Sequence, residues 1–88
     1  MARFEVRGTE SGAFDASTQA EILFEMGMMY ATGRDCDVDL VAAHKWFNIA
    51  AVKGCERAAI MRNEISVSMS KVDLATALRA AREWMTAH

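Results

Sequence analysis

The chain has 88 residues, carries a net charge of -2 at pH 7 and contains no proline, and hydrophobic residues make up 52% of it. A chain of this length forms one domain with a modest buried surface, so its stability depends on well-fitted helices or on a partner surface. The net charge is too small for electrostatics alone to attract nucleic acid or an anionic membrane, and we expect neither as a partner.

The charge is unevenly distributed along the chain. Residues 1–38 carry three basic and seven acidic side chains, a net charge of -4, whereas residues 39–88 carry seven basic and five acidic side chains, a net charge of +2. Opposite charges on the two parts favour head-to-tail contact between copies. A homo-oligomer is therefore one of the expectations.

The sequence indicates a cytoplasmic location. Four charged residues interrupt the apolar positions of residues 1–12, so this stretch lacks the apolar run of a signal peptide, and no later run reaches membrane-spanning length. Two cysteines, Cys36 and Cys55, are fewer than a disulfide scaffold of this size needs. We expect both thiols to be reduced.

The first seventeen residues show little regular pattern. Phe4 and Val6 alternate with charged residues as in a short strand, and Gly8 and Gly12 then break any regular run. We predict a flexible N-terminal arm over residues 1–17, followed by one helical domain over residues 18–88.

A first helix is predicted to begin at Ser17 or Thr18. Either residue can serve as an N-cap, and Glu21 completes a capping box with Thr18. Apolar residues then recur at helical spacing as far as Tyr30, and Gly33 is expected to end the helix.

A polar turn over residues 34–38 separates the first helix from a second. Asp39 is the expected N-cap of the second helix, which ends near Gly54. Small residues allow the two helix backbones to approach, and these are Gly27, Ala43 and Ala50. Aromatic residues are predicted to fill the remaining volume, and these are Tyr30, Trp46 and Phe47.

Two further helices are predicted after Gly54. The third runs from about residue 56 to residue 67 and places Ala58, Met61 and Ile65 on one face. The fourth is capped by Ser70, with Asp73 in its first turn. Its expected buried stripe consists of Leu74, Leu78, Ala81 and Met85, widened by Ala77 and Trp84.

The stretch from residue 20 to residue 54 resembles the Sel-one-like repeat (SLR), a helical-hairpin relative of the tetratricopeptide repeat. The matching residues, in chain order, are Ala20, Met26, Gly27, Tyr30, Gly33, Asp39, Ala43, Trp46, Phe47, Ala50, Ala51 and Gly54. The loop departs from the family pattern, which tends to have glycine, an apolar residue and proline where this chain has Asp35, Cys36 and Asp37.

The resemblance implies how the rest of the chain is organised. Residues 18–54 correspond to one full repeat, and residues 55–88 to a decayed second repeat and a capping helix like that of small bacterial members. The implied fold is all-α, with about four helices in antiparallel hairpins of an α-α superhelix. The implied function is a non-catalytic protein–protein interaction module, acting as an adaptor or a regulatory subunit.

The titratable residues do not form a recognisable catalytic or metal-binding pattern. The residue types that such sites use are present at Cys36, Cys55, His44, His88, Glu25 and Asp39. No Cys-x-x-Cys pair accompanies them, and no second histidine lies near His44. We therefore expect no enzyme activity, no cofactor and no bound metal.

Two alternatives come from the cysteines and the basic residues. Arg57 near Cys55 would favour a reactive thiolate, so a redox-sensing regulatory protein that uses Cys36 or Cys55 is the alternative function. Six basic residues could form a nucleic-acid surface, but glutamates interleave them and indicate a solvated face instead.

A partner surface is predicted from the cluster of Met26, Met28 and Met29. Consecutive residues on a helix project in different directions, so one of the three should be exposed. Flexible methionine side chains suit adaptable binding surfaces. The predicted patch, for a partner peptide or another copy, consists of Phe24, Met28, Ile49 and Val52. Alternatively, these side chains meet the N-terminal arm or the fourth helix.

Overall fold

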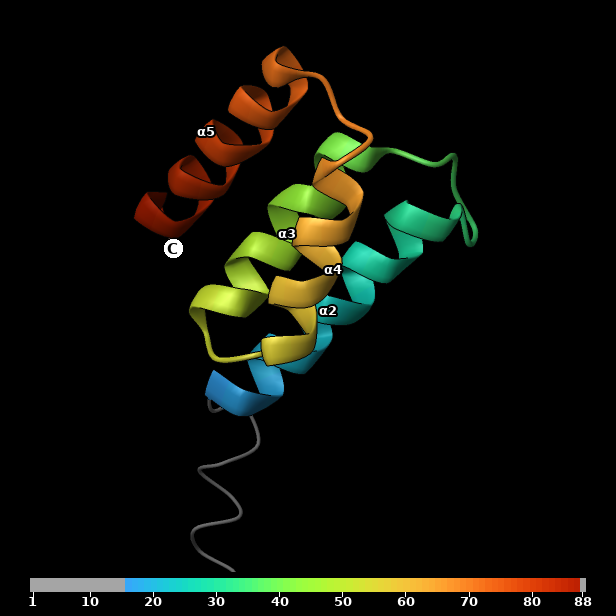
Figure 1. The fold of residues 1–88 in the computed structure, drawn as a ribbon. Helices are drawn as coiled ribbons and strands as arrows, with labels where there is room; N and C mark the ends of the chain where they lie inside the picture. Colours follow the sequence, from blue (N-terminus) through green and yellow to red (C-terminus); the bar gives the residue numbers. More distant parts are fainter. Residues whose placement is uncertain (1–15, 88) are drawn as a thin grey trace, which may run out of the picture.

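A computed structural model describes residues 16–87, which form four α-helices and no strand. The helices are α2 (Ala16–Thr32), α3 (Leu40–Val52), α4 (Glu56–Ser66) and α5 (Lys71–Ala87). Successive helices run in opposite directions (Figure 1). The prediction of an all-α fold of antiparallel hairpins is confirmed, whereas residues 1–15 of the predicted arm lie outside the described residues.

Helix α3 is the centre of the fold. It packs against α2, α4 and α5, and α2 also touches α4. In contrast, α5 makes little contact with α4 or α2, and Figure 1 shows α5 set apart from α4. The position of α5 therefore depends on α3.

The start of α2 differs from the prediction. The helix begins at Ala16, so Ser17 and Thr18 lie in its first turn and the predicted capping box is wrong. Residues 16 and 17 also belong to the helix instead of the arm.

The other predicted helix ends are confirmed. Gly33 follows the last residue of α2 with a φ of 75°, a conformation that glycine adopts without steric cost. The Asp39 side chain accepts a hydrogen bond of 3.0 Å from the backbone N–H of Ala42 at the start of α3. The Ser70 hydroxyl oxygen accepts one of 3.0 Å from the backbone N–H of Asp73 before α5.

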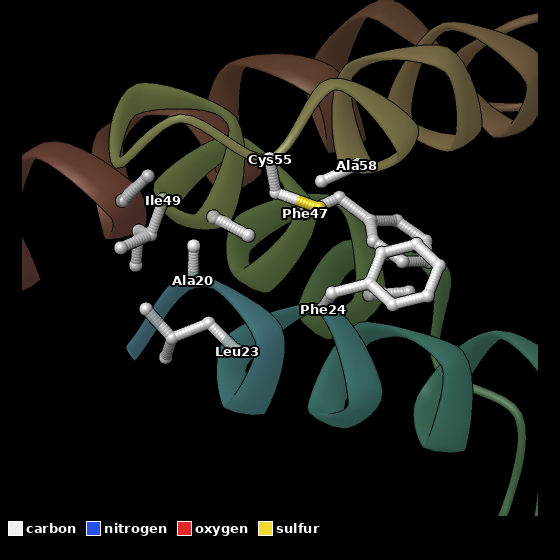
Figure 2. Packing of buried hydrophobic residues seen from close by; sticks show 10 residues of the cluster. Ala20, Leu23, Phe24, Phe47, Ile49, Cys55 and Ala58 are labelled. Carbon is white, nitrogen blue, oxygen red and sulfur yellow. The ribbon is translucent and has the colours of Figure 1, made fainter. Parts of the chain in front are cut away.

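The core is built around the contact of α2 with α3. Figure 2 shows Phe24 of α2 beside Phe47 of α3, with ring centroids 5.7 Å apart and ring planes at 45°. A Cβ atom built on Gly27 would lie 2.5 Å from two atoms of the Phe47 ring. Gly27 therefore gives Phe47 the space that the sequence predicts. Around this contact the core contains Ala20, Leu23, Ala43, Ile49, Ala50, Cys55, Ala58 and Ala81.

Trp46 does not lie between α2 and α3 as predicted. It is half-buried, and its ring meets the Trp84 ring of α5 nearly edge-on, with centroids 5.6 Å apart and ring planes at 79°. Adjacent residues on a helix point about 100° apart, so Trp46 and Phe47 cannot both face α2. Trp46 instead holds α5 against α3.

Polar contacts fix α4 on the surface of α2 and α3. Arg57 donates to Glu21 over 2.7 Å, and its guanidinium lies 4.4 Å from the centroid of the Phe24 ring. Arg62 donates to the Asn48 side chain over 2.9 Å. Ala58 is fully buried and lets the helix approach closely.

The buried face of α5 is narrower than predicted. Ala77 and Ala81 are fully buried, whereas Leu78 is 41% exposed, so the assignment of Leu78 to the buried stripe is wrong. Ala77 and Ala81 stand four residues apart and give α5 a flat line of contact with α3. Leu74 and Met85 flank this line and are half-buried.

Candidate functional site

Two adjoining cavities lie where α2 begins and where α3 and α5 end. The larger has a volume of about 450 Å³ and is lined by Gln19, Val52, Lys53, Trp84 and Met85. The smaller has a volume of about 140 Å³ and is lined by Gln19, Ile22, Leu23 and Trp84. Both cavities share Gln19 and Trp84, and we call the seven lining residues together the α2–α5 groove.

The groove results from the way the helices share α3. Both α2 and α5 pack on α3, but they make few contacts with each other. The groove lies between these two helices. Trp84 lines the groove, and its ring is oriented by the edge-on contact with Trp46. The site therefore has a rigid aromatic wall supported by the core.

The rim of the groove exposes branched apolar side chains to solvent. Ile22 is 50% exposed and Val52 is 65% exposed. The charged residue in the lining is Lys53, and the lining contains no carboxylate, histidine or cysteine. An apolar depression with an indole wall is suited to receive a large apolar side chain.

The predicted partner surface is wrong at two of its four positions. Phe24 is only 6% exposed because its ring packs against Phe47, and Ile49 is fully buried in the same core as Ala81 of α5. Met28 is half-buried and packs against this core. Val52 is exposed and lines the groove, so one predicted position remains part of the candidate surface.

Ile22 was not predicted to line a binding surface, and Trp84 was predicted to widen a buried stripe. A signal for Ile22 is present, since Ile22 and Leu23 are adjacent on α2 and cannot both point into the core. The partial exposure of Trp84 depends on the distance between α2 and α5, which periodicity does not specify.

The two cysteines lie in separate loops on either side of α3. Cys36 is half-buried, and its thiol donates to the Met29 carbonyl over 3.7 Å. Cys55 is buried and precedes α4 without a side-chain capping bond. Both are free thiols, and a 13-residue helix between them is about 20 Å long. A disulfide bond between Cys36 and Cys55 would need a large rearrangement of the backbone.

His44 is a buried residue of α3 that lies apart from the groove lining. It is 4% exposed, and its Nδ1 has no hydrogen-bond partner among the described residues. Burial lowers the pKa of His44, and the positive charge of Arg62 lowers it further. Both effects favour the neutral form of the imidazole.

The remaining titratable residues of the sequence analysis have structural contacts. Asp39 caps α3, and Glu25 lies 3.6 Å from Arg34, both on the surface. His88 lies outside the described residues. Within residues 16–87, no group of three or more histidine, cysteine, aspartate or glutamate residues is arranged to hold a metal ion.

Comparison of the chain with protein-family models, with curated proteins and with solved structures gave no match. In the part of the chain that the structure describes, no helix has both the length and the apolar character needed to cross a lipid bilayer.

Proposed function

We propose that the chain is a non-catalytic interaction module that binds a partner protein by accepting one of its large apolar side chains in the α2–α5 groove. The observation that carries the proposal is the pairing of a core-supported indole, Trp84, with the exposed apolar rim residues Ile22 and Val52. Such a rim excludes water from an anchoring side chain at the centre of an interface.

The size of the groove limits the affinity. Burying one leucine or phenylalanine side chain contributes about 1.5–3 kcal/mol. One anchor therefore gives weak binding by itself, and further contacts along α2 and α5 must supply the rest. An adaptor or a regulatory subunit that exchanges partners suits an interaction of this kind.

Local features support an SLR-type architecture. The close approach of Gly27 to Phe47 and the Asp39 cap are what the resemblance to that family requires. Asp35 has a φ of 64° at the loop position where the family tends to have glycine. We further propose that the protein acts in the bacterial cytoplasm, a reducing compartment in which the free Cys36 and Cys55 would persist.

A matched pair of substitutions tests the proposed function. Ile22 and Ile60 are 50% and 56% exposed, but only Ile22 lines the groove, while Ile60 is on α4. Ile22→Asp and Ile60→Asp would be compared with the wild type by quantitative affinity capture from the native cell. We expect Ile22→Asp to lose specific partners that Ile60→Asp retains.

Circular dichroism would first establish that both variants keep the helical content of the wild type. If both variants then recover the same proteins in the same amounts as the wild type, the groove is not the binding site. If the protein lost by Ile22→Asp is the chain itself, the partner is a second copy.

A further inference from the structure

We infer that copies of this chain associate head to tail, with the loop between α2 and α3 of one copy docked on an exposed face of α5 of the next copy. The loop consists of residues 33–39 and is called the acidic loop, and the α5 face consists of Leu78, Arg79 and Arg82. Neither surface lines the α2–α5 groove. The inference therefore goes beyond the proposed function and does not depend on it.

Charges of opposite sign lie in different parts of the described structure. Residues 16–39, which form α2 and the acidic loop, carry five acidic side chains and one basic side chain, a net charge of -4. Residues 40–87, which form α3, α4 and α5, carry seven basic and four acidic side chains, a net charge of +3. A head-to-tail arrangement of two copies brings these opposite charges together.

The acidic loop presents its side chains to solvent from a fixed backbone. Asp35 and Asp37 are exposed, and Val38 is 58% exposed. The backbone N–H groups of Arg34 and Asp39 each donate a hydrogen bond of 3.0 Å to a carbonyl oxygen in the last turn of α2. Because both ends of the loop are held in this way, the loop loses little conformational freedom when it binds.

Helix α5 has an exposed face with a matching chemistry. The helix packs on α3 through the buried Ala77 and Ala81 and makes little contact with the other helices. Arg79 and Arg82 are exposed, and Leu78, which is 41% exposed, lies within about 100° of both around the helix axis. Two guanidinium groups beside an apolar side chain suit a segment that carries carboxylates beside an apolar residue.

These two surfaces do not neutralise each other within one copy. Among residues 16–87, the acidic loop aspartates 35 and 37 and the two arginines of the α5 face take part in no ion pair. Figure 1 shows the α2–α3 connection and α5 on opposite sides of α3. The acidic loop therefore does not reach α5 of its own copy, and the contact forms between two copies.

The expected contact is weak and depends on salt. Exposed ion pairs contribute little individually, because water and dissolved salt screen them. An apolar contact of Val38 with Leu78 would add to the ion pairs. Since the two surfaces differ, each bound copy keeps one of them free, and association can continue into longer chains of copies.

Sedimentation equilibrium of the full chain tests the inference. We expect the average mass of the wild type to rise with protein concentration in about 20 mM NaCl and to return toward the monomer mass in about 500 mM NaCl. Asp35→Asn/Asp37→Asn should weaken association by about tenfold, and Arg79→Gln/Arg82→Gln should do the same.

A matched control separates the acidic loop from net charge. Glu56→Gln/Glu64→Gln removes two exposed carboxylates from α4 and changes the net charge as the acidic loop variant does. This variant should associate at least as strongly as the wild type. Ile22→Asp, which alters the α2–α5 groove, should also associate like the wild type, so the outcome is independent of the proposed function.

A mixture of the two weakened variants gives the sharpest result. Together they hold one intact acidic loop and one intact α5 face, so an equimolar mixture should form a one-to-one pair that neither variant forms alone. The inference would be overturned by a wild type that stays monomeric in low salt, or by association that either variant leaves unchanged. A mixture that stays monomeric, or a loss of association in Ile22→Asp, would also overturn it.

Discussion

Replacing Gly27 by alanine should destabilise the protein, although alanine is the better helix former. The added methyl group would lie 2.5 Å from Cδ1 and Cε1 of Phe47, where nonbonded carbon atoms prefer about 3.5–4.0 Å. Phe47 is fully buried, and its ring packs against Phe24 with centroids 5.7 Å apart. The ring therefore cannot move aside without displacing the core.

Two opposing effects determine the size of the change in the free energy of unfolding. An extra methyl group forced into a packed core costs about 1–3 kcal/mol. Exchanging glycine for alanine inside a helix returns about 1 kcal/mol. Because the methyl group overlaps two ring atoms by about 1 Å each, the steric cost belongs in the upper half of its range. We expect Gly27→Ala to lose about 1–2 kcal/mol.

Urea unfolding followed by far-ultraviolet circular dichroism measures this change. The Phe47→Ala background provides the control, because alanine lacks the Cγ, Cδ1 and Cε1 atoms that the methyl group would meet. In that background Gly27→Ala should be neutral or stabilising. If Gly27→Ala stabilises the wild type by the full helix-propensity gain, Phe47 does not pack on Gly27 and the reasoning is refuted.

Three further predictions follow from buried or capping groups. The free energy of unfolding should fall as the pH drops below 6.5. Burial, and to a smaller extent the charge of Arg62, lowers the pKa of His44 in the folded state, so the unfolded chain binds a proton at a higher pH than the folded chain does. Urea midpoints at about pH 7.5 and about pH 5.5 should differ less in His44→Gln, and an equal difference would contradict this role. Asp39→Ala should cost about 1 kcal/mol in urea unfolding through loss of the α3 cap, and an unchanged midpoint would argue against the cap. A thiol-reactive dye should label half-buried Cys36 faster than buried Cys55, and equal rates in the native protein would contradict the burial of Cys55.

The parts of the fold that could be predicted from the sequence depend on local chemistry. Gly33, Asp39 and Ser70 mark helix ends through backbone conformation and capping bonds with near neighbours in the chain. The contact of Gly27 with Phe47 follows from the facing sides of two helices joined by a short turn. Such features need no knowledge of the rest of the structure.

The candidate site could not be predicted in the same way. The partial exposure of Trp84 depends on how far α5 stands from α2, and the burial of Phe24 and Ile49 depends on which helix covers each face. The spacing of apolar residues along the chain shows that a residue packs against an apolar neighbour, but it does not identify that neighbour. The contact of Trp46 with Trp84 of α5, where the sequence predicted contact with α2, has the same origin.

Site-specific photo-cross-linking tests the proposed interaction site most directly. A photoreactive amino acid would replace Ile22 in the groove or, as the matched control, the similarly exposed Ile60 on α4, in the full chain within the native cell. We predict discrete adducts with a partner protein from position 22 and none from position 60. Adducts from position 60 alone, or the same adducts from both positions, would contradict binding in the α2–α5 groove.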